Sequence, residues 1–139
     1  MTVNDIMTEN PFLVQADTSL KNIIKYIENN PFDHIPVVNN ASELMGLISK
    51  VDVYKTLLRL STHTSGKVYT DNQLNHTTAQ DIMTTEVVTL SVDDALDKAI
   101  TVFNTHSFHS LPVLDKKILI GILTPKDILK HLSSDGSIK

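Results

Sequence analysis

At 139 residues the chain is long enough to bury a sizeable core, and 41% hydrophobic with 20% charged residues is ordinary usage for a globular domain. It contains no cysteine, which excludes disulfides, thiolate metal sites and cysteine catalysis. The formal charge is −4 and Arg59 is the sole arginine, without any run of basic residues, so nucleic acid is not an expected partner.

The predicted elements of the first half begin with a short helix around residues 3–7 and a strand near residues 12–14. Asp17 and Thr18 are typical helix caps, and they predict the start of the next helix. The apolar side chains of residues 20–27 then recur at helical spacing and form one stripe. A helix, a strand and a second helix are therefore expected in this order.

A β-hairpin is predicted to follow this second helix. Residues 34–38 are rich in β-branched side chains, and their proline suits a strand start or an edge strand. The Asn-Asn pair at residues 39–40 is a turn signal, and residues 44–48 form a second apolar run. Ser49 then opens a further helix with an apolar face.

The second half of the chain repeats this order. Asp-Ile-Met-Thr occurs at residues 5–8 and again 76 residues later at 81–84, and Gly46 recurs 75 residues later as Gly121. The elements predicted for the second copy are residues 87–90, 94–105, 111–114, 118–123 and 125–132. The chain is therefore predicted to be a duplicated unit. Its expected parts are a first motif at 1–60, a linker at 61–77, a second motif at 78–133 and a flexible tail at 134–139.

One polar motif recurs where each hairpin ends. A hydroxyl residue is followed by an aspartate three positions later, as Ser49 with Asp52 and as Thr124 with Asp127. One interpretation is a helix cap, in which the aspartate also favours the positive end of the helix. The other is a ligand site, because a helix N-terminus binds anions and a carboxylate can accept two hydrogen bonds from a ribose diol. The two interpretations are compatible.

The order of these motifs resembles the CBS (cystathionine-β-synthase) domain, here as a tandem pair over almost the whole chain. The matching motifs are D-I-M-T, a strand, a helix, h-P-V-h and G-h-h-[ST]-x-x-D, where h is hydrophobic. The resemblance implies an α+β (mixed α/β) fold of two β-α-β-β-α motifs, packed through their sheets with pseudo-two-fold symmetry. It also implies a regulatory homodimer that binds AMP, ADP, ATP or S-adenosylmethionine in clefts between motifs and signals by changing their relative arrangement.

The resemblance further implies two ligand sites. In each, an aspartate would hold the ribose hydroxyls, the residue after the motif glycine would pack on adenine, and the opening strand of the other repeat would close the pocket. The expected residues of the site on the second motif are Thr8, Pro11, Phe12, His109, Ser110, Ile122, Thr124, Lys126 and Asp127. The expected residues of the site on the first motif are Asp33, His34, Leu47, Ser49, Asp52, Thr84, Val87 and Val88.

Charge favours the site on the second motif. Lys126 and His109 would face a phosphate there, whereas the first site has Asp33 and a neutral Val51 in place of the lysine. An acidic neighbour costs a bound phosphate about 1 kcal/mol even when it is partly screened. We therefore expect one competent site, built on Asp127, for a lightly phosphorylated ligand, because neither site offers an arginine.

Other function classes have fewer supporting features. The alternative is a ligand-free interaction or dimerisation scaffold for a partner enzyme or transporter, which the arginine-poor phosphate positions favour. No nucleophile and base pair is evident for an enzyme such as a hydrolase, and no cofactor is required. His106 and His109 have no evident third ligand, so no metal site is expected. Short apolar runs and the lack of a signal-peptide pattern predict a cytoplasmic protein that does not enter a membrane.

Overall fold

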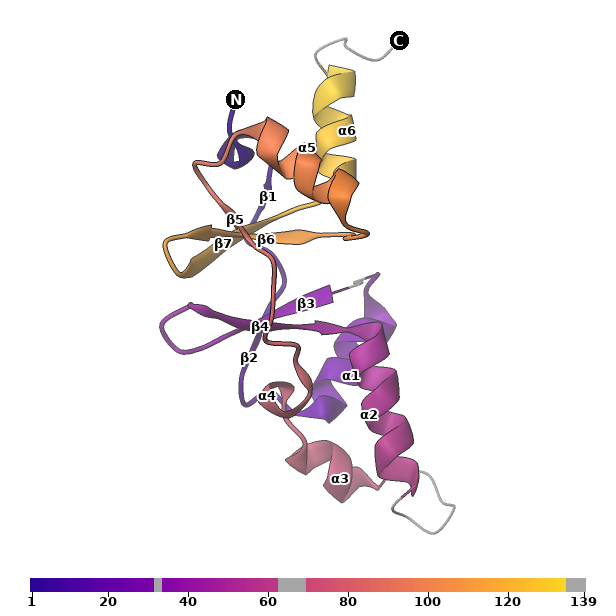
Figure 1. Cartoon of the computed structure of the whole chain (residues 1–139). Coiled ribbons are helices and arrows are strands. Elements are labelled where there is room, and N and C mark those ends of the chain that lie inside the picture. The colour runs from indigo at the N-terminus through magenta and orange to yellow at the C-terminus, as the bar shows by residue number, and fades with distance from the viewer. Residues whose placement is uncertain (32–33, 63–69, 135–139) are drawn as a thin grey trace. The chain divides into compact units, whose positions relative to one another are not determined.

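The chain folds into two compact units, which are shown as ribbons in Figure 1. One unit is Phe12–Val87, and the other joins Met1–Pro11 to the chain from Val88 onward. Each unit contains one small sheet and several helices, so the predicted mixed α/β class is confirmed. The residues that this computed structural model describes are 1–31, 34–62 and 70–134.

The sheet of the Phe12–Val87 unit has the strand order β2-β3-β4. Its strands are β2 (Val14–Gln15), β3 (His34–Val38) and β4 (Leu44–Ser49). Strand β2 runs parallel to β3, and β3 pairs with β4 as the predicted antiparallel hairpin. The described helices of this unit are α1 (Leu20–Asn29), α2 (Lys50–Thr62), α3 (Asp71–His76) and α4 (Ala79–Ile82). Figure 1 shows α1 and α2 on the same face of the sheet.

The cap of helix α1 differs from the prediction by one residue. Its N-cap is Ser19, whose hydroxyl accepts a hydrogen bond from the N–H of Asn22 at 3.2 Å. The hydroxyl of Thr18 instead accepts the N–H of Gln15 at 3.1 Å, in the turn that precedes the helix. Two neighbouring hydroxyl residues thus divide the turn and the cap between them, which the sequence pattern alone does not resolve.

The segment predicted as a linker contains helix α3. The helix begins with a capping box, in which the N–H of Gln73 donates to the hydroxyl of Thr70 and the N–H of Thr70 donates to Oε1 of Gln73. Lys21 of α1 lies 3.9 Å from a carboxylate oxygen of Asp71 on α3. The end of the linker is therefore ordered against α1. Residues 63–69 of the predicted linker, and the predicted tail from 135 onward, lie outside the described residues.

The other unit has a four-stranded sheet of order β1-β7-β6-β5. Its strands are β1 (Thr8–Glu9), β5 (Leu90–Ser91), β6 (Leu111–Asp115) and β7 (Ile118–Leu123). Its helices are the 3₁₀ turn Val3–Asp5, α5 (Leu96–Thr105) and α6 (Pro125–Ser134). Figure 1 shows α5 and α6 on one face of this sheet, as α1 and α2 lie on theirs.

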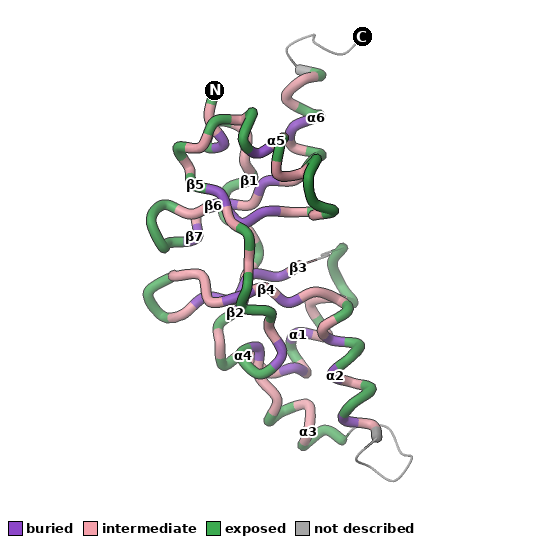
Figure 2. The backbone as a smooth tube through the Cα atoms, in the orientation of Figure 1, coloured by how far each residue is buried: buried purple, intermediate pink, exposed green. Residues whose placement is uncertain are grey.

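Each unit has its own apolar core, formed where the helices cover the sheet. Figure 2 shows buried residues along the strands and the inner faces of the helices, with exposed residues at the turns. The core of the Phe12–Val87 unit includes Val14, Leu20, Ile23, Ile35, Val37, Ile48 and Val53. The core of the other unit includes Val3, Leu90, Ala99, Leu111, Val113, Leu123 and Ile128.

The two units do not coincide with the two repeats of the sequence, because the opening segments are exchanged. Strand β1, which belongs to the first repeat, pairs antiparallel with β7 of the second repeat. Conversely, Thr84 of the second repeat forms a bridge with Leu47 of the first, through two backbone hydrogen bonds of 2.8 and 3.0 Å. Each Asp-Ile-Met-Thr segment therefore lies against the hairpin of the other repeat.

Candidate functional site

The [ST]-x-x-D motif forms a capping box in both units. In the unit that contains β7, the N–H of Thr124 donates to Oδ2 of Asp127 at 2.9 Å, and the N–H of Asp127 donates to the hydroxyl of Thr124 at 3.2 Å. Ser49 and Asp52 form the same pair at 2.9 and 3.1 Å. The cap interpretation is confirmed in both copies, and the motif aspartate stands where a strand ends and a helix begins.

A third segment reaches the aspartate of the second motif. The hydroxyl of Thr8 donates to Oδ1 of Asp127 at 3.0 Å, across 119 residues of sequence. The backbone of Thr8 is fixed at this place because Thr8 pairs with Ile122 in the β1-β7 register. Strand β1, the end of β7 and the start of α6 therefore meet at one carboxylate.

The strand register explains why the residues before β6 belong to the same edge of the sheet. Leu111 at the start of β6 pairs with Leu123 at the end of β7, so Ser110 and Thr124 are the next residues on each side. Ser110, Thr124 and Asp127 are half-buried, whereas Lys126 is exposed. The edge therefore combines half-buried hydroxyl and carboxylate oxygens with one exposed ammonium group.

Most of the residues expected for the second-motif site lie in this one unit. Thr8, Thr124 and Asp127 are joined by hydrogen bonds, Ile122 pairs with Thr8, and Ser110 follows from the register. His109 and Lys126 are exposed, and neither has an ion-pair partner among the described residues. Pro11 is the last residue of the segment that contains β1, and Phe12 is the first residue of the other unit.

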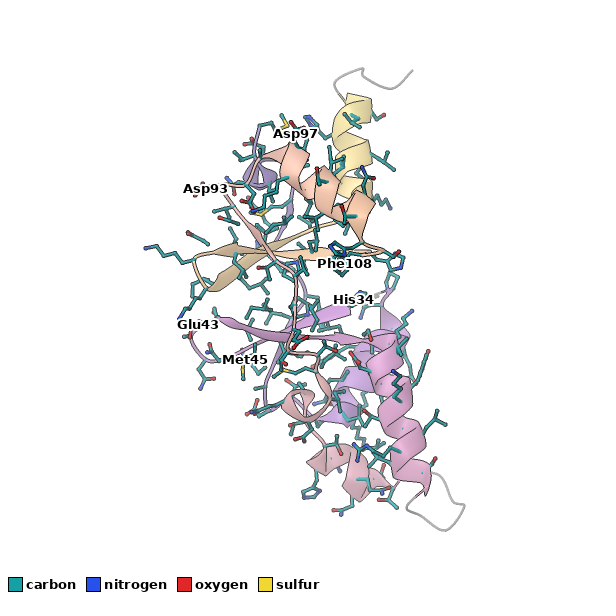
Figure 3. The ribbon with its side chains drawn as sticks, viewed as in Figure 1. His34, Glu43, Met45, Asp93, Asp97 and Phe108 are labelled. Carbon is teal, nitrogen blue, oxygen red and sulfur yellow. The ribbon has the colours of Figure 1, made fainter. Side chains whose placement is uncertain are left out.

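The site expected on the first motif is built from the corresponding elements, but its threonine–aspartate contact is longer. His34, which Figure 3 shows at the start of β3, pairs with Ser49 at the end of β4. Thr84 reaches Asp52 with its hydroxyl at 3.5 Å, and its backbone pairs with Leu47. The other expected residues of this site are Val87, half-buried in the same unit, Val88, which belongs to the other unit, and Asp33, which lies outside the described residues.

The sequence analysis gave no role to the methionine of the Asp-Ile-Met-Thr segment. A β-carbon built on Gly121 would lie 2.6 Å from the sulfur of Met7, and one built on Gly46 would lie 2.8 Å from the sulfur of Met83. Each methionine thus covers the motif glycine of the opposite repeat. Its recurrence beside the threonine in both copies was the signal that could have identified it.

No described residues gather into a metal site. Among them, no group of three or more His, Cys, Asp or Glu side chains is placed to hold an ion. The ring of His106 stacks on that of Phe108, with centroids 4.9 Å apart. No helix in the described part of the chain is long and apolar enough to cross a membrane.

A duplicated mixed α/β unit with a capping box at each sheet edge defines a tandem domain pair. Residues 3–59 and 79–134 match the CBS domain, once in each repeat, and the chain belongs to the CBS domain family. This confirms the resemblance drawn from the D-I-M-T and G-h-h-[ST]-x-x-D motifs.

The chain is similar to proteins of very different lengths. Inosine-5'-monophosphate dehydrogenase of Nitrosopumilus maritimus is 29% identical over 135 residues, which are 96% of this chain and 25% of the relative. The chain spans about a quarter of the length of the first curated relatives that it matches.

Solved structures of similar size share its fold. A hypothetical conserved protein of Geobacillus kaustophilus has a TM-score of 0.80 and 24% identity, covering 97% of this chain and 98% of that one. The structure of CBSX2 in complex with AMP has a TM-score of 0.75 and 25% identity, again covering 97% and 98%.

Proposed function

We propose that this protein is a regulatory module that binds an adenosine-containing ligand at the second-motif site. One observation carries the proposal: the carboxylate of Asp127 is held on both oxygens, by the N–H of Thr124 and the hydroxyl of Thr8. An ionised carboxylate offers about four lone-pair positions, so two remain for the hydroxyls of a ribose. The AMP complex of CBSX2 supports adenosine as the nucleoside, because that protein has the same fold.

The surroundings of Asp127 favour a ligand with few phosphates. The N-terminus of α6 favours an anion, and exposed Lys126 adds one positive charge in its first turn. The sole arginine of the chain is Arg59, which lies on α2 of the other unit. With a single lysine and no arginine near the site in its own unit, AMP, which carries one phosphate, is therefore expected to bind more tightly than ATP.

The first-motif site is proposed to bind more weakly. Val51 stands where the second motif has Lys126, and a neutral side chain contributes no attraction to a phosphate. The hydroxyl of Thr84 is 3.5 Å from the carboxylate of Asp52, at the limit of a hydrogen bond. Both differences act in the same direction, so Asp127 rather than Asp52 is the residue to test first.

The proposed role is regulatory and not catalytic, with a ligand-dependent change in the arrangement of the two motifs as the signal. Such a signal requires that the ligand bind one arrangement more tightly than the other. The ligand is not a required cofactor. A cytoplasmic location remains a prediction.

A scaffold is the second candidate function, and one surface feature favours it. Val51, Tyr54 and Leu58 of α2 are 55%, 59% and 67% exposed. Their spacing of three and four residues places them on one helix face. Exposed apolar stripes of this kind also support the predicted homodimer. Light scattering of the purified protein gives the mass in solution, and a monomer at high protein concentration would contradict the homodimer.

Calorimetric titration with AMP, ADP, ATP and S-adenosylmethionine tests the proposed function. The substitution Asp127→Asn removes the charge while keeping the size, and Asp52→Asn is the matched control in the other repeat. We expect binding of at least one ligand to the native protein and to Asp52→Asn, and at least a tenfold loss in Asp127→Asn. A ligand at 100 times its dissociation constant should also stabilise the protein by about 2.7 kcal/mol.

The outcomes separate the two candidate functions. Binding that requires Asp127 supports the sensor, and binding that requires only Asp52 moves the site to the first motif. If none of the four compounds binds or raises the unfolding temperature, the sensor proposal fails. The scaffold then becomes the better account of the protein's function.

A further inference from the structure

We propose that Thr8 is a positioning residue that orients the carboxylate of Asp127 for a ribose. The inference rests on the proposed function, because it concerns the same site. The carboxylate of the second-motif site is thereby oriented before a ligand binds, whereas that of the first-motif site is not. This difference does not depend on the charge of Lys126. The observation behind it is which carboxylate oxygen each threonine reaches.

In the second-motif site the two hydrogen bonds go to different oxygens. The N–H of Thr124 donates to Oδ2 of Asp127 at 2.9 Å, and the hydroxyl of Thr8 donates to Oδ1 at 3.0 Å. The terminal torsion of an aspartate has a broad minimum, so a carboxylate held at one oxygen can still turn. Holding both oxygens fixes the plane of the carboxylate and the direction of its free lone pairs.

In the first-motif site both bonds go to one oxygen. The N–H of Ser49 donates to Oδ2 of Asp52 at 2.9 Å, and the hydroxyl of Thr84 lies 3.5 Å from the same Oδ2. Among the described residues, none donates a hydrogen bond to Oδ1 of Asp52. The carboxylate of Asp52 is thus anchored at one point, and its plane is not fixed by Thr84.

The backbone that carries the donor is part of the sheet in the second-motif site. The backbone of Thr8 pairs with Ile122 in the sheet, and Met7 packs over Gly121. The hydroxyl therefore projects from a strand and not from a loose segment. A donor fixed in this way loses little further freedom when the ligand binds, which is the requirement for a positioning residue.

The position of Thr8 in the chain gives the inference a consequence for the pair of repeats. Thr8 belongs to the first repeat, whereas Asp127, Thr124 and the hairpin around them belong to the second. A ribose held by Asp127 would thus depend on a donor from each repeat. A chain that lacks the first motif should lose this orientation even if the second motif folds.

The test uses substitutions that remove or keep the hydroxyl group. Thr8→Val keeps the shape and removes the donor, and Thr8→Ser keeps the donor. Thr101→Val is the control, because Thr101 is exposed on α5 and its hydroxyl donates to the carbonyl of Asp97, outside both sites. Affinities for AMP and for 2'-deoxy-AMP are measured by calorimetry with each variant. The ratio of the AMP affinity to the 2'-deoxy-AMP affinity reports on the ribose contact. A variant that only lowers the free energy of unfolding leaves this ratio unchanged.

We expect the native protein and Thr8→Ser to prefer AMP over 2'-deoxy-AMP by at least fivefold. Thr8→Val should bind AMP about tenfold more weakly and lose most of that preference, because the carboxylate of Asp127 is no longer held facing the ribose. Thr101→Val should behave as the native protein. If Thr8→Val keeps both its affinity and its preference, the positioning role is overturned while the proposed function stands. If the native protein binds neither nucleotide, the proposed function fails and the inference fails with it.

Discussion

The carbonyl oxygen of Thr84 lies 2.7 Å from the place that a β-carbon on Gly46 would occupy. Two hydrogen bonds hold this approach, because the N–H of Leu47 donates to the carbonyl of Thr84 and the N–H of Thr84 donates to the carbonyl of Leu47. Gly121 has the same relation to Thr8, whose carbonyl would lie 2.9 Å from an added β-carbon. The motif glycine therefore makes room for the exchanged backbone of the other repeat.

The substitution Gly46→Ala should lower the free energy of unfolding by about 1–3 kcal/mol, because a backbone atom must move to admit the methyl group. Gly121→Ala should have a similar effect for the same reason. Urea unfolding followed by circular dichroism measures both. Asn40→Ala, at an exposed turn position of the same hairpin, is the control and should change stability by less than about 0.5 kcal/mol. An unchanged midpoint for both glycine variants would contradict the close approach.

The aspartate of the Asp-Ile-Met-Thr segment has a structural explanation. Oδ2 of Asp5 accepts the N–H of Thr2 at 2.9 Å, and Oδ2 of Asp81 accepts the N–H of Thr78 at 2.9 Å. Each pair caps a short helical turn. Asp5→Ala or Asp81→Ala should therefore cost about 0.5–2 kcal/mol of stability, which thermal unfolding measures.

The control for these cap substitutions is Asp93→Ala. Asp93, which is labelled in Figure 3, is exposed, and its carboxylate accepts no hydrogen bond from the described residues. Its removal should leave the unfolding temperature within about one degree of the native value. Equal losses in all three variants would show that net charge, and not capping, sets the effect.

The sequence predicted the strands that consist of continuous apolar or β-branched runs. Residues 34–38 and 118–123 are strands β3 and β7 with the predicted bounds. The capping boxes were predicted correctly because the aspartate follows the hydroxyl residue three positions later, which is a local spacing. Local spacing and apolar periodicity are the two signals that a single sequence carries most clearly.

The sequence did not reveal relations that depend on distant pairing. Helix α3 has one apolar residue that packs on the core, Leu74, so it has no periodic pattern and was assigned to a linker. Each threonine reaches the motif aspartate because its backbone pairs with the residue after the motif glycine of the other repeat, Ile122 for Thr8 and Leu47 for Thr84. The Asp-Ile-Met-Thr segments that contain Thr8 and Thr84 are identical in sequence, so the difference between the two sites became visible only in the structure.

The turn between β6 and β7 contains a strained residue. Lys116 has a φ of 59°, in the left-handed region that a side chain disfavours. Lys116→Gly should therefore raise the free energy of unfolding by about 0.5–1 kcal/mol, since relief of strain exceeds the added freedom of the unfolded chain. The neighbouring Lys117 does not have a positive φ, so Lys117→Gly relieves no strain and should be neutral or destabilising. Urea unfolding of the two glycine variants measures the difference. Equal changes in the free energy of unfolding would contradict the strain at Lys116.

Lys126 should distinguish a phosphate contact from general charge. Lys126→Ala is expected to weaken AMP binding about fivefold and to leave adenosine binding unchanged, because one exposed ion pair in water is worth about 1 kcal/mol. Lys130→Ala removes an exposed cation one turn further along α6 and should change AMP affinity by less than twofold. The difference between the two variants should shrink from 50 to 200 mM salt as screening increases. An equal loss of AMP affinity in both variants would indicate long-range attraction by the exposed lysines of α6. A loss of adenosine affinity in Lys126→Ala as large as its loss of AMP affinity would show that Lys126 supports the fold of the site and does not contact the phosphate.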